Sequence, residues 1–147
     1  RENLEDVIRF MGLETRGALE RVFVVGGKQL GITCAEMLEG QGVAVKLFER
    51  DARRSARIAG ILEKTTVIRA DGTDQAILEE ENVEGVDAFL AFTNDDEDNI
   101  IASLLARRLG ARKVAALINR LKDGLAESRA QQDRLATTLI ETALKAA

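Results

Sequence analysis

Three glycines within six residues form the part of this sequence best suited to chemistry. Gly26 can make a tight turn after an apolar stretch, and Gly31 lets a following helix pack close to that stretch. Lys28 stands where a phosphate-binding loop usually has its middle glycine, so its side chain either crowds a pyrophosphate or reaches over it as a cation. The pattern predicts a phosphate-binding loop, with a ligand-free turn between strand and helix as the alternative. The candidate residues are Gly26, Gly27, Lys28, Gln29, Leu30 and Gly31.

An acidic residue, Glu49, follows this loop at a distance typical of ribose recognition. It comes 18 residues after Gly31, where a carboxylate at the end of a second strand accepts hydrogen bonds from ribose hydroxyls. Its charge also repels a 2′-phosphate, which favours NAD, ATP or ADP over NADP. A solvated charge at a strand end is the alternative. Arg50 is placed to touch an adenine or a phosphate, whereas Arg53 and Arg57 are typical of a solvated helix face.

A second polar segment, Asp71-Gly72-Thr73-Asp74, follows a third apolar stretch. Turn chemistry explains it without a ligand, because the glycine permits a tight turn and Thr73 or Asp74 can cap the next helix. It also lies at the carboxyl end of a strand, where open parallel sheets bind their ligands. Asp71 and Gly72 are therefore candidate binding residues.

A third polar segment, TNDDEDN, spans residues 93–99 and opens a helix. Asn94 with Glu97 fits a capping box, and carboxylates suit the positive end of the helix dipole. Four consecutive acids exceed what capping requires, so a divalent cation site at residues 95–98 is an alternative to a helix start that faces water. Thr93 opens this segment, directly after a strand.

The elements that would position these residues alternate along the chain. Apolar, β-branched runs without polar alternation predict strands buried on both faces, and amphipathic segments between them predict helices. Such alternation is typical of βαβ units in a parallel sheet. Strands are expected at 22–25, 43–48, 66–70, 88–92 and 113–118, and helices at 30–38, 51–64, 74–81 and 95–109. The predicted fold class is α/β, a Rossmann-like parallel sheet flanked by helices.

The 147 residues divide into one domain and two flanking segments. Residues 1–20 are expected to be a linker with a short amphipathic helix, and residues 21–120 the nucleotide-binding domain. Residues 121–147 carry one apolar helical stripe beside a polar stretch and are expected to be an additional C-terminal helical segment. That segment could pack on the domain or on another copy of the chain.

Composition narrows the function. The net charge of −4 disfavours nucleic acid as a partner, and the single cysteine, Cys34, excludes an internal disulfide and favours a reducing compartment. No apolar run approaches the ~20 residues that a membrane-spanning helix needs. The sequence contains no histidine, tyrosine or tryptophan, and this disfavours an enzyme that relies on common proton-transfer side chains.

Several segments together resemble a known family. The stretches VFVVGGKQLG, LFERD, ADGTD, FLAFTNDDEDNIIASLLARRLG and INR, in this order, are similar to the nucleotide-binding lobe of RCK (or KTN) domains and to the TrkA family in particular. The likeness covers residues from about Arg21 to Arg120. The segment RENLEDVIRFMGLE resembles the approach to the second of two RCK units. Two departures are Lys28 in place of the middle glycine and a tail without the expected small C-terminal lobe.

The resemblance implies a regulatory subunit of a Trk-type potassium uptake system. Such a lobe would bind NAD(H) or ATP/ADP, assemble as a homo-oligomeric ring and act on a membrane potassium-transporting subunit from the cytoplasmic face of the membrane. Ligand exchange would shift the population of ring conformations. Carried over by position, Gly26, Gly27 and Gly31 would hold phosphates and Glu49 the ribose.

The same resemblance would place Asp71 near the adenosine and Thr93 near the far end of the pocket. Two alternatives remain open beside the regulatory nucleotide-binding subunit. One is a nucleotide-free assembly module, in which Lys28 closes the site. The other is an NAD-dependent oxidoreductase domain, which shares the fold but needs a proton-transfer residue and a substrate pocket.

Overall fold

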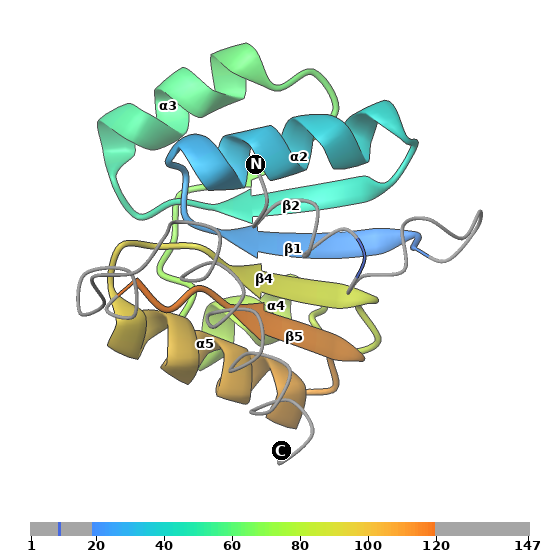
Figure 1. The fold of residues 1–147 in the computed structure, drawn as a ribbon, viewed down its shortest axis with the longest axis vertical. Helices are drawn as coiled ribbons and strands as arrows, with labels where there is room; N and C mark the ends of the chain where they lie inside the picture. The colour runs from blue at the N-terminus through green and yellow to red at the C-terminus, as the bar shows by residue number, and fades with distance from the viewer. Residues whose placement is uncertain (1–8, 10–18, 120–147) are drawn as a thin grey trace, which may run out of the picture.

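The computed structural model describes residue 9 and residues 19–119, which form a five-stranded sheet with helices on both faces. In chain order the elements are β1 (Arg21–Val25), α2 (Gln29–Gly40), β2 (Ala44–Phe48), α3 (Ala52–Ile61), β3 (Thr66–Ile68), α4 (Gln75–Glu80), β4 (Ala88–Ala91), α5 (Asp96–Arg108) and β5 (Lys113–Ala116). Figure 1 shows α2 and α3 on one side of the sheet and α5 on the other. The Rossmann-like α/β prediction is confirmed. The predicted N-terminal helix and the C-terminal helical segment at 121–147 lie outside the described residues.

All strand pairs are parallel, and their order across the sheet is β3-β2-β1-β4-β5. The strands β2 and β3 therefore lie in succession on one side of β1, and β4 and β5 lie in succession on its other side. Val25, the last residue of β1, pairs with Phe48 on one side and Ala91 on the other. The strand order reverses between β1 and β4, and the crevice beyond the strand ends at such a point is where open α/β sheets bind ligands.

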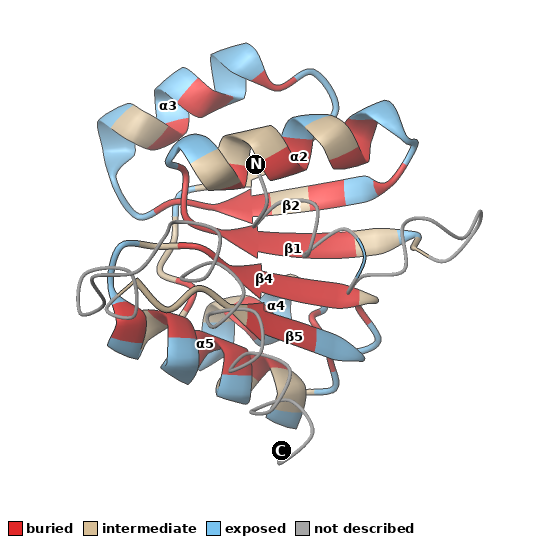
Figure 2. Ribbon diagram, in the orientation of Figure 1, coloured by how far each residue is buried: buried red, intermediate tan, exposed pale blue. Residues whose placement is uncertain are grey.

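The central strands are buried on both faces because helices cover both (Figure 2). Along β1, Val22 and Val24 belong to one core, while Phe23 and Val25 belong to the other. The first core includes Cys34 of α2 and Ile58 of α3, and the second includes Leu78 of α4 and Ala102 of α5. Successive side chains of a strand point to opposite faces, and here both faces are covered by an apolar core. This explains why every residue of β1 after Arg21 is apolar.

The α3 helix ends at Ile61, three residues earlier than the sequence pattern predicts, because Leu62 adopts an extended conformation. The chain then turns over the carboxylate of Glu39, which is 9% exposed and accepts hydrogen bonds from the N–H groups of residues 63, 64 and 65 at 3.2, 3.0 and 2.8 Å. Burial opposes ionisation of this carboxyl, but the hydroxyl of Thr65 and the three N–H groups outweigh it and lower its pKa. Glu39 thus fastens the end of α2 to the loop before β3.

The sequence predicts the wrong capping residue for α5. The N-cap is Asp95, whose side chain accepts a hydrogen bond from the N–H of Asp98 at 2.9 Å. The prediction placed the cap at Asn94 with Glu97 as its partner. The helix begins at Asp96, one residue later than that pairing requires, because Asp95 itself has extended backbone angles.

No helix among residues 19–119 is long and apolar enough to cross a bilayer.

Candidate functional site

A cleft of about 420 Å³ opens at the carboxyl ends of the strands, at the point where the strand order reverses. Its volume suits a small-molecule ligand. Most residues that the sequence singles out meet here, although they come from four separate loops. The cleft is lined by Gly26, Gly27, Lys28, Glu49, Arg50, Asp71, Gly72 and Thr93, among others.

The glycine loop is close-packed against its neighbours. Gly26 has a φ of +108°, and a Cβ on it would lie 2.7 Å from the carbonyl oxygen of Phe92. A Cβ on Gly27 would collide with the side chain of Ile58, and one on Gly31 would collide with the carbonyl oxygen of Gly26. The three glycines therefore let β1 turn sharply into α2, and they bring the helix N-terminus to the cleft.

Lys28 fits the loop without strain. It is the N-cap of α2 with φ −91° and ψ −173°, an extended conformation open to any residue. Its side chain is exposed, makes no capping hydrogen bond and lines the cleft. The first turn of a helix also carries N–H groups without intrahelical partners, so a cationic amine and the helix N-terminus lie at the same end of the cleft.

Gln29, Leu30 and Gly31 lie in the first turn of α2, outside the lining of the cleft. The amide of Gln29 donates a hydrogen bond to the hydroxyl of Thr33 at 3.0 Å along the helix surface. Leu30 packs against the core between the sheet and α2. These residues shape the loop, and the cleft itself is formed by the residues before them.

Glu49 lies at the end of β2 and turns its carboxylate toward the glycine loop. Its side chain is only 5% exposed. Oε2 accepts a hydrogen bond from the N–H of Gly27 at 2.7 Å, and Oε1 accepts one from the N–H of Asp51 at 3.0 Å. The guanidinium of Arg54 donates to Oε1 at 3.1 Å. The carboxylate is thus held in one orientation at the cleft wall, with a lone pair of Oε2 left to accept a further hydrogen bond.

Arg50 reaches across the mouth of the cleft from β2 toward α5. Its Nη1 lies 3.9 Å from Oδ2 of Asp71 and 3.5 Å from Oδ2 of Asp98. The side chain is 67% exposed, so these ion pairs contribute little to stability. They do place a cation at the opening of the cleft.

The turn after β3 is fixed by its own side chains. Oδ1 of Asp71 accepts hydrogen bonds from the N–H and the hydroxyl of Thr73 at 2.9 and 2.8 Å. Burial raises the pKa of this carboxyl, but the bonds from Thr73 and the charge of Arg50 outweigh burial and hold the pKa below its usual value. Gly72 lies against β1, where a Cβ would stand 2.5 Å from a methyl carbon of Val25. The turn therefore forms a close-fitting wall of the cleft.

On the opposite side, Thr93 is bound into a network around Asn99, which is fully buried. Oδ1 of Asn99 accepts hydrogen bonds from the N–H and the hydroxyl of Thr93 at 2.9 and 2.6 Å. Its Nδ2 donates to the carbonyl oxygens of Thr93 and Leu117 at 3.0 and 2.9 Å. All four hydrogen-bonding positions of the amide are occupied, so Asn99 ties the end of β4 to the chain beyond β5.

Three of the four consecutive acids at 95–98 have different partners. Asp95 caps α5, Asp96 accepts a hydrogen bond from the N–H of Asn119 at 2.7 Å, and Asp98 faces Arg50. Within residue 9 and residues 19–119, no group of three potential metal ligands converges. Helix capping and contacts within the domain account for the pattern at these positions.

Three residues near the cleft were not among the predicted ones. Arg54 fixes Glu49, and Asn99 and Asn119 tie α5 to the end of β5. The sequence offers a signal for Arg54, because it lies three residues after the helix cap Asp51, in the first turn that faces the strand end. Asn99 and Asn119 belong to family-like stretches of the sequence, but the sequence does not show that Asn99 bonds to Leu117 or that Asp96 bonds to Asn119, because these partners are distant in sequence.

Solved structures share this fold at low identity. The "GsuK channel bound to NAD" superposes with a TM-score of 0.62 and 18% identity, covering 84% of this chain and 21% of that one. An NAD(P)-binding domain of an exopolyphosphatase-related protein from Archaeoglobus fulgidus gives a TM-score of 0.58 and 21% identity over 70% of this chain and 77% of that one. These likenesses support the Rossmann-like fold.

Curated relatives are much more similar in sequence. The Trk system potassium uptake protein TrkA of Vibrio alginolyticus is 46% identical over 100 residues, which are 68% of this chain and 22% of the relative. The TrkA homolog 1 of Methanosarcina mazei is 35% identical over 120 residues, 81% of this chain and 29% of the relative. The chain therefore spans between a fifth and a third of the length of these relatives.

A family model described as the TrkA-N domain matches residues 22–137, which is more than half of the chain. This agrees with the curated relatives and confirms the resemblance that the sequence motifs indicated. The chain belongs to the TrkA-N domain family.

Proposed function

We propose that this chain is a nucleotide-binding lobe of a regulatory subunit in a potassium uptake system, and that it binds NAD(H) or ATP/ADP without converting it. The supporting observation is the cleft at the strand-order reversal. There the N-terminus of α2, the amine-bearing Lys28 and the carboxylate of Glu49 face one space. The helix N-terminus and the lysine can bind phosphate groups, and a carboxylate at the end of β2 can accept hydrogen bonds from ribose hydroxyls.

Each wall has a part in this proposal. Gly26 and Gly27 line the phosphate end of the cleft before the first turn of α2, and Lys28 supplies a positive charge there. Glu49 has one lone pair of Oε2 left for a ribose hydroxyl. Asp71 and Gly72 border the adenosine end, and Thr93 the far end of the cleft. Arg50, at the mouth, is placed to contact an adenine or a phosphate.

Binding without turnover is favoured over oxidoreductase chemistry. The chain has no histidine or tyrosine, and the side chains that line the cleft are mainly carboxylates, arginines and small polar groups. Hydride transfer to a substrate usually needs a placed proton donor and a substrate pocket beside the cofactor. Oxidation of NADH by this chain, with any carbonyl substrate, would favour the oxidoreductase alternative.

The relatives are named as potassium uptake proteins, so the proposed partner is a membrane potassium-transporting subunit on the cytoplasmic side of the membrane, where this chain would be peripheral. A nucleotide can bias such a partner only through different affinities for two conformations of the regulatory assembly. Equal affinity for NAD(H), ATP and ADP in the presence and absence of the partner would contradict this mechanism.

A homo-oligomer is part of the proposal. The α5 helix exposes Ile100, Ile101 and Leu104, at 43%, 52% and 53%, and their spacing places them on one side of the helix. An apolar stripe of this kind suits contact with a second copy. Light scattering should show Ile101→Glu shifting the chain toward monomer, whereas Ile61→Glu, at the isolated exposed isoleucine of α3, should leave the mass unchanged.

Calorimetric titration with NAD⁺, NADH, ATP and ADP tests nucleotide binding directly. We expect saturable binding that Glu49→Ala weakens about tenfold or more, because a charged acceptor for a ribose hydroxyl is lost. Glu36→Ala, at an exposed acid on α2, is the matched control and should bind as the unmodified chain does. Binding only after Lys28→Gly would favour the nucleotide-free assembly module. Absence of binding in every variant would reject the assigned site.

A further inference from the structure

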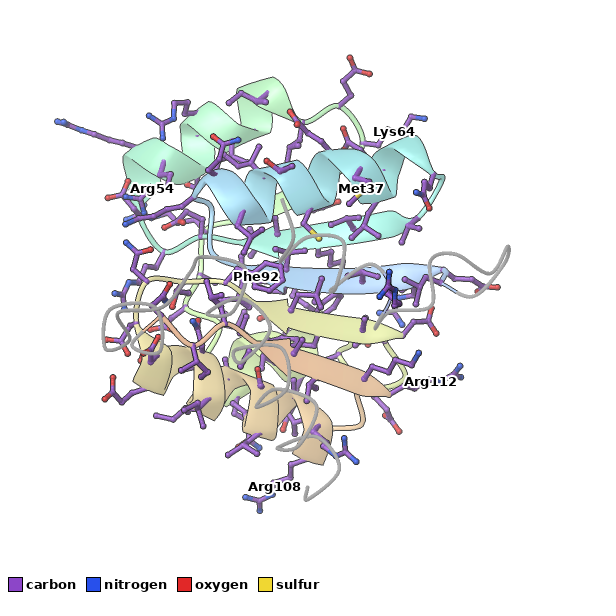
Figure 3. The ribbon with its side chains drawn as sticks, viewed as in Figure 1. Met37, Arg54, Lys64, Phe92, Arg108 and Arg112 are labelled. Carbon is purple, nitrogen blue, oxygen red and sulfur yellow. The ribbon has the colours of Figure 1, made fainter. Side chains whose placement is uncertain are left out.

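Arg54 is the one cation in the described residues that touches the carboxylate of Glu49. Its Nη1 lies 3.1 Å from Oε1, and its side chain is 32% exposed and lines the cleft. Its own N–H donates to Oδ1 of the cap residue Asp51 at 2.7 Å. The cap at the start of α3 therefore fixes the backbone from which this side chain reaches Glu49. Figure 3 labels Arg54 at the end of α3 that lies on the arrowhead side of the strands.

This pairing changes the electrostatics at the ribose position. Glu49 alone would repel a 2′-phosphate, and the sequence argument for NAD, ATP or ADP over NADP depends on that repulsion. Arg54 neutralises the carboxylate at contact distance, so the pair carries no net charge. One N–H of the guanidinium is directed at Oε1, and a guanidinium has five donors in a planar fork. Donors remain for a second anion on the cleft side.

We propose that Arg54 determines specificity at the ribose 2′ position, and that the cleft accepts adenine dinucleotides with either a 2′-hydroxyl or a 2′-phosphate. Glu49 receives the hydroxyl, and Arg54 receives the phosphate. Acidic and arginine side chains at the end of β2 are the two known solutions for these two groups, and here both stand in contact. This inference rests on the proposed nucleotide site and extends its ligands to dinucleotides with a 2′-phosphate.

The other arginines nearby are less suited to the role. Arg50 is 67% exposed and pairs with Asp71 and Asp98 at the mouth of the cleft, whereas Arg54 is 32% exposed and contacts Glu49 itself, the residue proposed to bind the ribose. Arg53 and Arg57 lie on the exposed side of α3 and do not line the cleft. Arg53 is adjacent to Arg54 in sequence and equally charged, which makes it a matched control.

The test compares NAD⁺ with NADP⁺, since the two differ only in the 2′-phosphate. Calorimetric titration of the unmodified chain should give dissociation constants within about tenfold of each other. Arg54→Gln should weaken NADP⁺ about tenfold more than NAD⁺, because a charge-assisted contact to phosphate is lost. Arg54→Lys keeps the charge and should retain most of the NADP⁺ affinity, and Arg53→Gln should leave the ratio unchanged.

Two results would overturn the inference while the proposed function stands. One is NAD⁺ binding with NADP⁺ at least about 100-fold weaker in the unmodified chain. The other is an unchanged ratio in Arg54→Gln whose NAD⁺ affinity shows that the cleft is intact. If the unmodified chain binds neither dinucleotide, nor ATP or ADP, the proposed function and the inference fail together.

Discussion

The two sides of the cleft use polar residues in different ways. We call the first the glycine side, residues 26–31 with Glu49, and the second the threonine side, residues 93–99 with Asn119. On the threonine side, Asn99 is fully buried and all four of its hydrogen bonds go to Thr93 and Leu117. On the glycine side, Lys28 is exposed without a capping bond, and within the described part of the chain only Gly27 donates to Oε2 of Glu49, which lines the cleft.

The most conspicuous polar motif of the sequence is therefore not the one that we propose to bind the nucleotide. The run of acids on the threonine side is used for capping and for contacts within the domain, so it frames the cleft. The glycine side looks plainer in sequence, but it brings a helix N-terminus, a lysine and a carboxylate to one opening. Variants on the threonine side should therefore change stability first, and variants at the cleft edge of the glycine side should change affinity first.

The largest effect is expected where the glycine side is packed most tightly. In Gly31→Ala the new methyl group would collide with the carbonyl oxygen of Gly26, so α2 must move away from β1. We expect the free energy of unfolding to fall by more than about 3 kcal/mol, measured by urea denaturation. Gly60→Ala is the control, because nothing lies within 4 Å of its Cβ and alanine favours a helix. Comparable stability of the two variants would show that the loop is not close-packed.

A smaller loss is expected on the threonine side. Asn99→Ala leaves the N–H of Thr93 and the carbonyl oxygens of Thr93 and Leu117 without their partner. Stability should fall by about 2 kcal/mol, while nucleotide affinity, measured at a temperature where the variant is folded, changes less than twofold. Asn94→Ala, at an exposed position of the same loop, should alter stability little. A large loss of affinity in folded Asn99→Ala would move the binding role to the threonine side.

Glu39 is a buried carboxylate like Glu49, but it does not line the cleft. Its hydrogen-bond partners lie in the loop at 63–65. Its folded pKa is lowered below the ordinary 4.5. The ionised carboxylate of Glu39 therefore stabilises the folded state above pH 4.5. This contribution to the free energy of unfolding is lost as the pH falls through the folded pKa. Glu39→Gln should cost about 1 kcal/mol at neutral pH and flatten the acid limb of the stability curve, with nucleotide affinity unchanged. An unaltered acid limb would contradict this assignment.

The smallest effect on stability is expected at Lys28. Its extended backbone and exposed side chain mean that Lys28→Gly should change the free energy of unfolding by less than about 0.5 kcal/mol. Affinity should respond more, and more for ATP than for NAD⁺, because the triphosphate carries more negative charge toward the lost cation. Calorimetry checks both ligands. Equal changes for the two nucleotides would mean that Lys28 does not contact the phosphate end.

Much of the site could be predicted from local pattern. Gly26, Gly31 and Glu49 are recognisable because a strand, a tight turn and a helix succeed one another within a short stretch, although the atom that a Cβ on Gly26 would meet belongs to Phe92, far along the chain. The pairing of Glu49 with Arg54 is also local, five residues apart, and the position of Arg54 three residues after the cap Asp51 distinguishes it from the other arginines nearby, which its charge does not. The orientation of the first turn of α3, set by Asp51 as its cap, decides that Arg54 reaches Glu49.

The alternation of strands and helices, the parallel sheet and the glycine turn could all be predicted from the sequence. Hydrophobic periodicity and backbone sterics are properties of neighbouring residues, so they can be read along the chain. The tertiary structure decided which polar groups are satisfied within the protein and which remain open to a ligand. Asn99 bonds to Leu117, Asp96 to Asn119 and Arg50 to Asp98. These pairs form only once crossovers bring distant strand ends together, because a hydrogen bond or an ion pair depends on distance in space and not on separation in sequence.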